Sequence, residues 1–540
     1  METAADLVRS RAGDPRPGLL FEGRAWTWAE VVDEAGARAA GMGRRHVGVL
    51  LENVPEYVFL LAGAALSGAV VVGLNPTRRG EELARDVRHT DCQVVVTERP
   101  ELLAGLDLGH AEVVPPAWPA GRPAPTAGRR APTAGRPAPT DLFVLIFTSG
   151  STGHPKAVKV SHGRAVRSAT GVPFSADDVL YSAMPLFHGN ALFSNLLPAF
   201  HAGCRVVLRR RFSASAFLGD IRQYHCTFFN TVGRAIAHIN ATPPTDRDRD
   251  HHLKWVLGPE TSEADKAAFT ARFGVAVFDG YGSSENAVIL HPARRSSQPG
   301  PLGVAPPGTD VAVVDPATGE ERPRARFDRA GTLLNPEEAI GEIVGRDAAG
   351  RFEGYYNDPE AEALRLRNGW YWSGDLAYRD EDGVFYFAGR TGDWLRVDSE
   401  NFTAAPIERI LARAPGVAGV AVYPVPDVCS ADRVMAAVEM APGVTFDPVE
   451  FREFLAGQPD MGPKWIPTYV RLTQLPVTAT DKVDKKPLRA AAWHTDDQIW
   501  RRRARTMDFE LMTTGDRLAL DAELAANGRA HLLASTTSGA

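Results

Sequence analysis

The chain has 540 residues, and at about 100 to 200 residues per domain this length excludes a single small binding module. Its 60 Lys and Arg residues are outnumbered by 66 Asp and Glu residues, so the formal net charge is -6 and offers no positive field for nucleic acid or an anionic membrane. Hydrophobic residues make up 44% of the sequence, which is sufficient for an ordinary buried core.

The N-terminal residues carry several charges and no apolar run of the length that a secretory signal needs, so we expect a cytoplasmic protein. The most apolar stretch, residues 57–74, is interrupted by Gly63, Ser67 and Gly68. We interpret it as a buried helix followed by a strand rather than as a membrane span. The cysteines form no CxxC pair and predict reduced, mostly buried thiols rather than a zinc site or disulfides: Cys92, Cys204, Cys226 and Cys429.

Short apolar runs alternate with helical stretches along residues 1–390, which predicts one large α/β domain whose sheet is largely parallel. The expected strands are residues 47–51, 94–97, 143–147, 205–208, 255–257 and 275–278. Within residues 115–140 lie three near-copies of a seven-residue unit rich in Pro, Gly and Arg. This low-complexity segment predicts an extended surface insertion, because it has almost nothing to bury.

The pattern changes after residue 370, where polar turns alternate with apolar strands. A helix over 406–413 and a strand over 417–424 are expected next. We predict a hinge at 391–393, a smaller, mobile α+β C-terminal domain over 394–500 and a tail over 501–540. The tail includes an amphipathic stretch, residues 518–533, that is consistent with a helix. The predicted fold class is therefore α/β, with layered sheets in the large N-terminal body.

The most informative motif is Phe-Thr-Ser-Gly-Ser-Thr-Gly-His-Pro-Lys at residues 147–156, directly after an apolar strand. Backbone N–H groups and hydroxyls in a loop so rich in Ser, Thr and Gly converge on an anion, and the lysine adds positive charge. The loop is not the Walker phosphate loop, because Pro155 precedes the lysine and Ala157 follows it, where that motif has Gly and Ser or Thr.

Further motifs follow in order: Tyr-Gly-Ser-Ser-Glu at 281–285, Ser-Gly-Asp-Leu at 373–376, Gly-Arg at 389–390 with Glu-Asn at 400–401, and Pro-Val-Thr-Ala-Thr-Asp-Lys at 476–482. Together they resemble the motifs of the adenylate-forming superfamily of acyl-CoA synthetases, luciferases and peptide-synthetase adenylation domains. The resemblance covers most of the chain. It is closest to fatty-acyl-CoA synthetases, as Gly-Tyr-Tyr-Asn-Asp at 354–358 and Pro-Leu-Phe-His at 185–188 also suggest.

The resemblance implies a nucleotide site built from the loop and the motifs after it. The loop would cradle the phosphates of ATP, the adenine would lie along Tyr281, and Asp375 would accept hydrogen bonds from the ribose with Arg390 nearby. The implied nucleotide-binding residues are Thr148, Ser149, Gly150, Ser151, Thr152, Gly153, Lys156, Gly258, Tyr281, Gly282, Asp375 and Arg390.

The same resemblance implies the catalytic residues: Lys482, Glu285, Ser284 and His188. Glu285 would hold Mg²⁺, a hard ion that prefers carboxylate and phosphate oxygens, and Ser284 keeps the hydroxyl that relatives supply from Thr. Lys482, in the second domain, would stabilise the charge that develops when the carboxylate attacks the α-phosphate. The substrate pocket would be bordered by His188, Asn286 and Ala287.

These assignments predict an ATP- and Mg²⁺-dependent ligase that converts a carboxylic acid to an acyl adenylate and passes the acyl group to CoA. Its expected partners are the acid, ATP and CoA, without nucleic acid and without a membrane span. The motifs fix the nucleotide chemistry and leave both the acid and the oligomeric state open.

Three departures from the family pattern keep a second function open. Asn286 and Ala287 follow Glu285 where many relatives have glycines, Ser399 precedes Glu400 and Asn401 where relatives often have Gly, and Asp481 replaces the Gly before Lys482. A small polar pocket and a narrowed approach for CoA would suit activation of nitrite and its transfer to an amine or hydrazine nitrogen. A catalytically inactive binding protein and a peptide-synthetase adenylation domain are less favoured, because the catalytic residues are present and no carrier domain follows.

Overall fold

The computed structural model describes most of the chain, with short gaps. The described residues are 1–118, 136–148, 155–259, 261–293, 295–296, 298, 300–329, 333–390, 394–397, 400–428, 432–458, 460–478, 482–503, 506–530 and 532–533. The predicted hinge at 391–393 and most of the predicted insertion therefore lie outside the described residues, and both remain predictions.

The chain divides into two compact units. Unit 1 consists of Met1–Gly150, Pro155–Ile289 and Gly350–Leu364, and unit 2 consists of Ser151–His154, Leu290–Ala349 and Arg365–Ala540. Among the described residues of the expected site, Thr148, Lys156, Gly258, Tyr281, Gly282 and Glu285 fall in unit 1, whereas Asp375, Arg390 and Lys482 fall in unit 2.

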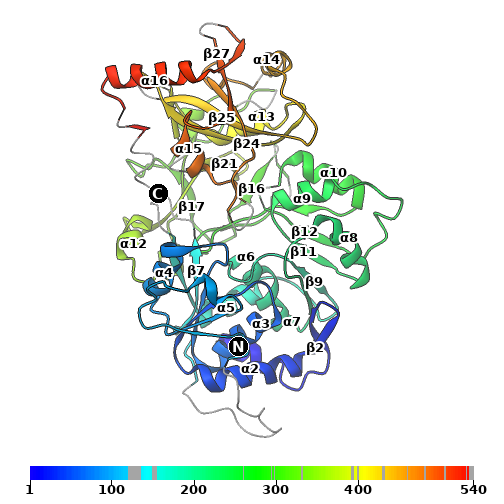
Figure 1. The fold of residues 1–540 in the computed structure, drawn as a ribbon. Helices are drawn as coiled ribbons and strands as arrows, with labels where there is room; N and C mark the ends of the chain where they lie inside the picture. The colour runs from blue at the N-terminus through cyan, green and yellow to red at the C-terminus, as the bar shows by residue number, and fades with distance from the viewer. Residues whose placement is uncertain are drawn as a thin grey trace. The chain divides into compact units, whose positions relative to one another are not determined.

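Unit 1 contains two mainly parallel sheets in its described part (Figure 1). The seven-stranded sheet has the order β13-β12-β11-β9-β10-β1-β2, and the six-stranded sheet has the order β6-β5-β3-β4-β7-β8. Only the terminal pairs β1–β2 and β7–β8 are antiparallel, so the prediction of largely parallel pairing is confirmed here. Strands buried on both faces read as continuous apolar runs, which is why the sequence located them well.

The strands of these sheets are β1 (Pro17–Phe21), β2 (Arg24–Thr27), β3 (His46–Leu50), β4 (Val70–Gly73), β5 (Val94–Thr97), β6 (Glu112–Val114), β7 (Leu142–Thr148), β8 (Lys156–Ser161), β9 (Val179–Ser182), β10 (Arg205–Leu208), β11 (Phe228–Asn230), β12 (Trp255–Leu257) and β13 (Val277–Phe278). The bounds expected for β5, β10 and β12 are exact. The last strand begins at Val277, two residues later than expected.

The helices before and between these strands are α1 (Ala4–Arg9), α2 (Trp28–Met42), α3 (Pro55–Ser67), α4 (Gly80–His89), α5 (His162–Thr170), α6 (Gly189–Ala191), α7 (Leu197–Ala202), α8 (Ala214–Gln223), α9 (Gly233–Asn240) and α10 (Glu263–Phe273), with a 3₁₀ turn at Pro100–Leu102. Later in the chain come the 3₁₀ turn Ala349–Arg351 and helix α12 (Pro359–Arg365). A π-helix, η2 (Leu192–Leu196), joins α6 to α7. Residues 57–74 form α3 and β4, as expected, and α3 is buried on nearly every side. None of the helices in the described residues is long and apolar enough to cross a membrane.

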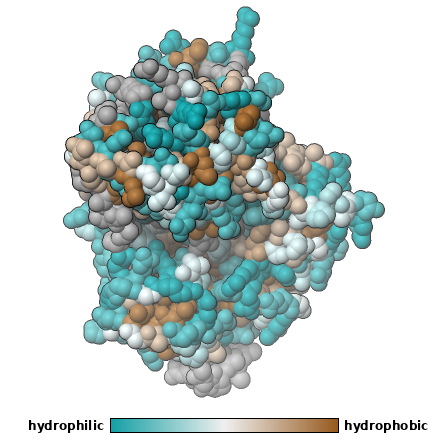
Figure 2. Space-filling model, turned by 45° about the horizontal axis from the view of Figure 1, so that its top comes forward, coloured by the Kyte–Doolittle hydropathy of each residue, from teal (hydrophilic) through white to brown (hydrophobic). Residues whose placement is uncertain are grey.

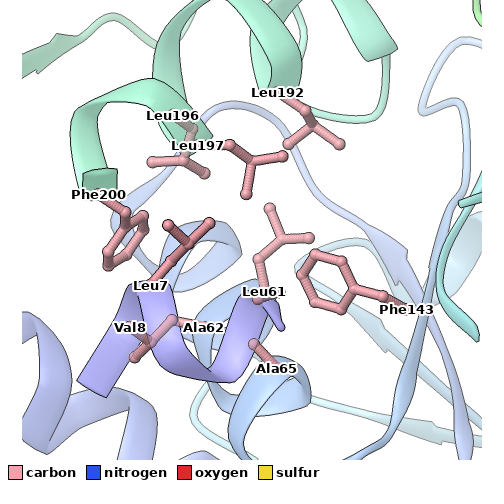
Figure 3. Close-up of a pocket in the computed structure, with 11 residues that line it drawn as sticks. Leu7, Val8, Leu61, Ala62, Ala65, Phe143, Leu192, Leu196, Leu197 and Phe200 are labelled. Carbon is pink, nitrogen blue, oxygen red and sulfur yellow. The ribbon is translucent and has the colours of Figure 1, made fainter. Parts of the chain in front are cut away.

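An apolar cavity of about 20 Å³ lies where α1, α3 and α7 meet (Figure 3). Its lining includes Leu7, Leu61, Phe143, Leu192 and Phe200, and it presents no polar surface. A substrate pocket needs several hundred Å³, and a water needs polar partners. We therefore interpret this cavity as a small dry packing defect.

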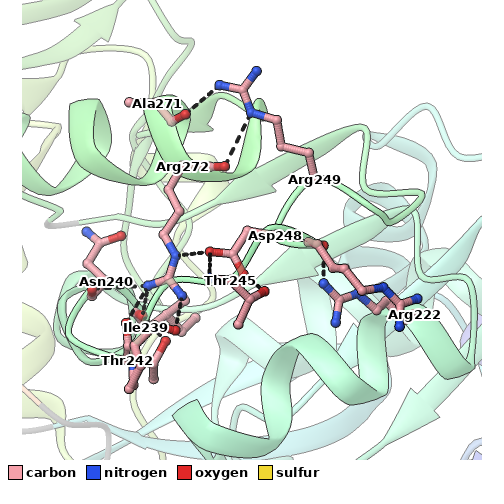
Figure 4. Close-up of polar contacts among 11 residues, drawn as sticks. Arg222, Ile239, Asn240, Thr242, Thr245, Asp248, Arg249, Ala271 and Arg272 are labelled. Carbon is pink, nitrogen blue, oxygen red and sulfur yellow. Dashed lines mark hydrogen bonds and ion pairs between the residues drawn. The ribbon is translucent and has the colours of Figure 1, made fainter.

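Arg272, near the end of α10, secures the C-terminal end of α9 (Figure 4). Its guanidinium donates to the carbonyl oxygens of Ile239 at 3.1 Å and Thr242 at 2.8 Å, and to Asp248 Oδ2 at 2.6 Å. Burial alone would raise the pKa of Asp248, but hydrogen bonds from Arg272 and Thr245 outweigh it and lower that pKa to about 2. The arginine thus satisfies helix-end carbonyls that would otherwise lack donors.

Unit 2 begins with an antiparallel sheet of order β16-β21-β20-β18-β17, to which β19 adds beside β20. Its strands are β16 (Pro301–Val304), β17 (Val311–Val314), β18 (Gly341–Gly345), β19 (Leu366–Arg367), β20 (Trp370–Arg379) and β21 (Val384–Arg390), with a short helix α11 (Pro336–Ala339). The predicted meander is confirmed as β20 and β21. The largely parallel pairing expected for residues 1–390 does not extend to this sheet, whose described pairs are all antiparallel. Within it, β20 and β21 form a hairpin across a short turn, a connection that only antiparallel strands allow.

The C-terminal part of unit 2 is a five-stranded sheet of order β24-β25-β26-β27-β28 with helices around it. The elements from residue 394 onward are β22 (Trp394–Val397), β23 (Glu400–Thr403), α13 (Ala404–Leu411), β24 (Val417–Pro426), β25 (Asp432–Met440), α14 (Pro448–Ala456), β26 (Tyr469–Leu472), α15 (Lys485–Ala491), β27 (Gln498–Arg502), β28 (Phe509–Leu511) and α16 (Thr514–Ala526). The expected helix and strand near 406–424 are confirmed with shifted ends. Part of the predicted tail completes this fold, since β28 extends the sheet and Leu520 and Leu524 are buried in its core.

Cys92, Cys204 and Cys226 are buried free thiols, as expected, and burial raises the pKa of each to about 12. Cys429 lies outside the described residues. Large apolar side chains that are exposed, such as Leu334 and Leu518, are scattered along the chain. On the face drawn in Figure 2, hydrophobic patches are small and separated by hydrophilic surface.

Candidate functional site

The two ends of the predicted phosphate loop lie side by side on paired strands of unit 1. Thr148 ends β7 and is the register partner of Lys156, the first residue of β8. Lys156 is only 3% exposed, so this lysine is largely shielded from solvent. Ser149, Gly150, Ser151, Thr152 and Gly153 lie outside the described residues, and their roles remain predictions.

Lys156 is connected to Glu285 through Tyr355, which follows the 3₁₀ turn Ala349–Arg351 in unit 1. The Lys156 ammonium lies 5.3 Å from the centre of the Tyr355 ring, within the range of a cation–π contact. The Tyr355 hydroxyl donates to Glu285 Oε1 at 2.7 Å, and both side chains are buried. Unit 1 therefore brings together the lysine of the phosphate loop and the carboxylate expected to hold Mg²⁺, although they are far apart in the sequence.

Two arginines hold the main chain around Glu285. Arg164 of α5 is 1% exposed and donates to the carbonyl oxygens of Lys159, at 2.9 Å, and of Ser284. Arg351 Nε donates to the carbonyl oxygen of Ala287 at 3.1 Å. The Ser284–Glu285 segment is thus fixed from both sides, which limits how far the carboxylate can move.

Asn286 has a structural role that its sequence position did not reveal. Its φ of 54° lies in the left-handed region, and its N–H donates to the Ser283 carbonyl oxygen at 3.0 Å in a tight turn. Among residues with a side chain, Asn adopts this conformation comparatively easily, and Gly adopts it most easily. A glycine in relatives and an asparagine here therefore meet the same backbone requirement, while Ala287 is buried beside it.

Gly258 and Tyr281 follow strands at the same end of unit 1. Gly258 comes directly after β12, and a Cβ there would lie 2.9 Å from Thr261 Oγ1 and from Val277, so the close packing requires glycine. Tyr281 and Gly282 form the short strand β14 (Tyr281–Gly282), which pairs with β15 (Ile289–Leu290). Tyr281 is partly exposed and Gly282 has open space around it, as a nucleotide-facing position would need.

His188 lies just before α6, in a segment that the core positions closely. Asn53 accepts from the Leu186 N–H at 2.9 Å and donates to the Met184 carbonyl oxygen at 2.8 Å. Gly73 of β4 allows the same segment to approach, because a Cβ there would lie 3.0 Å from the Phe187 carbonyl oxygen. His188 is partly exposed and contacts the Phe187 ring.

In unit 2, Asp375 and Arg390 are register partners on β20 and β21. Asp375 follows a kink at Gly374, whose φ is 76° and whose N–H donates to Glu342 Oε1 at 2.7 Å. Burial raises the pKa of Glu342, and the Gly374 N–H and Arg367 oppose that rise. The kink and its buried carboxylate fix the backbone from which Asp375 projects. The Arg390 side chain lies outside the described part of the structure.

The main chain of Lys482, in unit 2, is hydrogen-bonded to Thr478. Its N–H donates to Thr478 Oγ1 at 3.3 Å, its carbonyl oxygen accepts from the Thr478 N–H at 2.7 Å, and Val477 pairs with Val483. The Lys482 side chain is exposed, in contrast with that of Lys156. Ser399 and Asp481, which motivated the alternative function, lie outside the described residues.

The structure adds Tyr355 and Arg164 to the residues that the sequence singled out. Tyr355 is the first tyrosine of Gly-Tyr-Tyr-Asn-Asp, a motif that supported the resemblance but received no role. Arg164 has no local signal, because an arginine in a helix is ordinarily solvent-exposed. Only the fold shows that each contacts the Ser284–Glu285 segment.

A protein-family model described as AMP-binding enzyme matches residues 9–356 of the chain. The chain is 47% identical to the steroid-22-oyl-CoA synthetase of Rhodococcus jostii, covering 98% of this chain and 99% of that protein. It is 43% identical to the medium/long-chain-fatty-acid–CoA ligase FadD17 of Mycobacterium tuberculosis, covering 89% and 95%. The solved structure of ATP-bound MatB from Rhodopseudomonas palustris aligns with a TM-score of 0.76 at 24% identity, covering 90% and 98%, and shows the shared fold.

The chain belongs to the AMP-binding enzyme family, among its acyl-CoA synthetases. It is an acyl-CoA ligase that uses ATP and releases AMP. Of the two functions that the sequence left open, the relatives favour acyl-CoA formation over nitrite activation. The left-handed turn at Asn286 agrees with this result, since it removes one argument for a specialised polar pocket.

Proposed function

We propose that the protein activates a large apolar carboxylic acid, with a steroid-22-oic acid as the first candidate and a medium- or long-chain fatty acid as the second. The support is the identity of 47% over nearly the full length with a steroid-22-oyl-CoA synthetase, against 43% with a fatty-acid ligase. The acid would react with ATP to form an acyl adenylate and pyrophosphate. The thiol of CoA would then attack the acyl carbon and release AMP.

The observation that carries the adenylation step is the buried connection from Lys156 through Tyr355 to Glu285. The carboxylate of the substrate must approach a triphosphate, so the site has to offset like charges before the reaction begins. Lys156 supplies a fixed cation at the end of the loop, and burial strengthens its interaction with phosphate. Thr148 supplies a hydroxyl from the neighbouring strand.

Mg²⁺ fits the surroundings of Glu285. Tyr355 donates to Oε1 of this carboxylate at 2.7 Å, and Oε2 would bind a hard cation. The described residues contain no group of three or more His, Cys, Asp and Glu side chains arranged for a metal, so the proposed ion would take its other oxygens from phosphates and water. When bound, the ion would offset phosphate charge.

Lys482 and Asp375 complete the proposed machinery from unit 2. Asp375 would accept hydrogen bonds from the ribose, at a backbone position fixed by the Gly374 kink. Lys482, an exposed residue, would stabilise the charge on the reacting carboxylate and α-phosphate. We propose that the C-terminal domain, residues 394–500 with the added β28 and α16, moves about a hinge at 391–393 between the two half-reactions.

The test is a panel of acids in pyrophosphate exchange, followed by mass spectrometry of the products with CoA present. We expect exchange with steroid-22-oic acids, weaker exchange with dodecanoate, and none with benzoate or nitrite. AMP and acyl-CoA should form in equal amounts. Exchange driven by nitrite, or AMP formation without acyl-CoA, would contradict the proposal.

A further inference from the structure

A buried polar cluster lies at the carboxyl ends of two neighbouring strands in the seven-stranded sheet of unit 1. Ser182 is the last residue of β9, Asn230 is the last residue of β11, and the two are register partners in the parallel pair. Asn190 lies on α6, two residues after His188. Ligands of open α/β sheets bind at this edge, so polar side chains here lie where a substrate approaches.

The hydrogen bonds of Asn230 fix the orientation of its amide. Its Nδ2 donates to the main-chain oxygen of Asn190 at 3.3 Å and to the side-chain oxygen of the same residue. Because both partners are acceptors, the nitrogen of Asn230 faces Asn190 and its oxygen faces the other way. Asn190 is partly exposed, whereas Asn230 is 0% and Ser182 1% exposed.

Two polar atoms of this cluster are unsatisfied. Asn230 Oδ1 and Ser182 Oγ are buried, and no atom of the described residues forms a hydrogen bond with either. Buried polar groups are normally paired, and an unpaired one lowers stability unless a ligand or water completes it. An unfilled acceptor and an unfilled hydroxyl therefore lie at the ends of adjacent strands.

Asn53 shows what a purely structural buried asparagine looks like in the same unit. Its Nδ2 donates to the carbonyl oxygens of Met184, at 2.8 Å, and Arg209, at 3.2 Å, and its Oδ1 accepts from the Leu186 N–H at 2.9 Å. Every group of that amide has a partner. Asn230 differs in that its nitrogen is fixed while its oxygen is unfilled, and it does so at the carboxyl end of a sheet strand, where ligands of α/β sheets bind.

We infer that Asn230 and Ser182, with Asn190 as the positioning residue, form a subsite for a hydroxyl group of the acid substrate remote from its carboxylate. A hydroxyl donates to Asn230 Oδ1 and accepts from Ser182 Oγ, whereas a ketone cannot donate to the amide oxygen. The subsite rests on the proposed function, since it would bind a group of the acid that the enzyme activates. It predicts a preference for the hydroxyl over the ketone and for both over a methylene group.

Equilibrium dissociation constants of acids in the absence of ATP test this subsite without relying on turnover. The probes are three steroid-22-oic acids with a hydroxyl, a ketone or a methylene at the ring position farthest from the carboxylate, together with dodecanoate and its terminally hydroxylated form. For whichever skeleton binds, the hydroxylated acid should bind at least about tenfold more tightly than its hydrocarbon analogue. Binding of no probe, or equal binding of hydroxylated and hydrocarbon acids, would overturn the inference.

Asn230→Leu should reduce the ratio of the two dissociation constants, hydrocarbon acid over hydroxylated acid, to about one. The substitution removes the hydrogen-bond acceptor while keeping the side-chain volume. Asn240→Leu is the matched control. Asn240 also has a buried unpaired Oδ1, and its Nδ2 donates to the Asp265 carbonyl oxygen. It is the last residue of α9 and is not part of a sheet strand. Its ratio should equal that of the parent. If Asn230→Leu does not fold, Ser182→Ala should lower the ratio instead. A lower melting temperature with an unchanged ratio would assign Asn230 a structural role only.

The result distinguishes this inference from the proposed function. Tight binding with the expected ratio but without pyrophosphate exchange would contradict the enzyme assignment and leave the subsite standing. Pyrophosphate exchange with all acids but without any hydroxyl preference would contradict the subsite alone.

Discussion

Two lysines assigned to the same reaction lie in opposite environments. Lys156 of unit 1 is 3% exposed, starts a strand, and is connected through Tyr355 to Glu285. Arg164 and Arg351 donate to carbonyl oxygens on either side of that glutamate. Lys482 of unit 2 is exposed, and its N–H donates to Thr478 Oγ1. In the mechanism that we propose, this difference would mean that the phosphate site is formed before substrates bind, whereas Lys482 would act only during the reaction.

The largest effect expected from this difference is on the rate of adenylation. Lys482→Ala should slow pyrophosphate exchange by about a hundredfold to a thousandfold, the scale for removing one group that stabilises the transition state. The melting temperature should remain at the parent value because Lys482 is exposed, and ATP affinity should remain because we propose that Thr148 and Lys156 of unit 1 bind the phosphates. The matched control is Lys486→Ala, an exposed lysine four residues later, which should keep the parent rate. Normal exchange in Lys482→Ala would remove this lysine from the mechanism.

Arg272→Met should give the converse result, a loss of stability with normal kinetics. The substitution leaves Asp248 and several carbonyl oxygens at the end of α9 without their donor, which should cost about 3 kcal/mol. The pKa of Asp248 is lowered to about 2 in the folded protein, against about 4 in the unfolded chain. Its contribution to the free energy of unfolding is therefore fully present above about pH 4 and is lost as the pH falls toward 2. The difference between the melting temperatures at pH 7 and pH 2 should therefore be smaller in the variant than in the parent.

An equal pH dependence in Arg272→Met and the parent would show that the ion pair does not stabilise unit 1. Because Arg272 lies outside the candidate site, kcat/KM per folded molecule should stay at the parent value. A large change in kcat/KM would instead indicate that the α9–α10 packing controls the site.

Tyr355→Phe should have an intermediate effect confined to the metal-dependent step. The substitution keeps the ring that faces Lys156 and removes the hydroxyl that donates to Glu285 at 2.7 Å. We expect kcat/KM to fall about tenfold and the Mg²⁺ concentration for half-maximal activity to rise, since the carboxylate loses its positioning partner. Tyr356→Phe is the control, because that hydroxyl donates to Asp91 at 2.9 Å on the surface. Equal behaviour of the two variants would exclude the proposed role of Tyr355.

The smallest effect is expected from the low-complexity insertion. Deleting residues 120–135 should leave turnover within about threefold of the parent, because surface loops tolerate changes of length. The deletion should stop there, since Arg136 pairs with Asp6 at 2.7 Å and the Pro139 carbonyl oxygen accepts from the Gly163 N–H at 2.8 Å. Loss of soluble protein on deleting 120–135 would show that the segment packs against the fold.

The sequence predicted strands better than it predicted contacts. The apolar runs of β5, β10 and β12 gave exact bounds, because strands buried on both faces have a composition that needs no tertiary information. The start of α16 was placed four residues too late, since the capping box of Thr513 and Asp516 extends the helix beyond its apolar stretch. Of the antiparallel sheet of unit 2 the sequence predicted only the β20–β21 part and assigned the rest to the α/β domain, because an apolar run does not specify which strand it pairs with.

The sequence predicted only those residues of the candidate site that belong to a recognisable motif. Lys156 and Glu285 were found through resemblance, but Tyr355 lies 70 residues from Glu285, and only the fold shows their hydrogen bond. Asn286 was interpreted as a pocket amide, whereas its positive φ gives a backbone reason for the residue. The sequence shows which side chains can bind a cation or an anion, but it does not show the backbone conformation of Asn286 or the contact between Tyr355 and Glu285.

The central claim is that a carboxylate oxygen of the substrate attacks the α-phosphorus of ATP before CoA receives the acyl group. The most direct test uses a steroid-22-oic acid, or dodecanoate if that is the acid accepted, labelled with heavy oxygen at both carboxylate positions and converted with ATP and CoA. The account predicts one labelled oxygen in AMP and one in the acyl-CoA, because the attacking oxygen stays on phosphorus when the thiol displaces AMP. Unlabelled AMP, or label in ADP or inorganic phosphate, would contradict it.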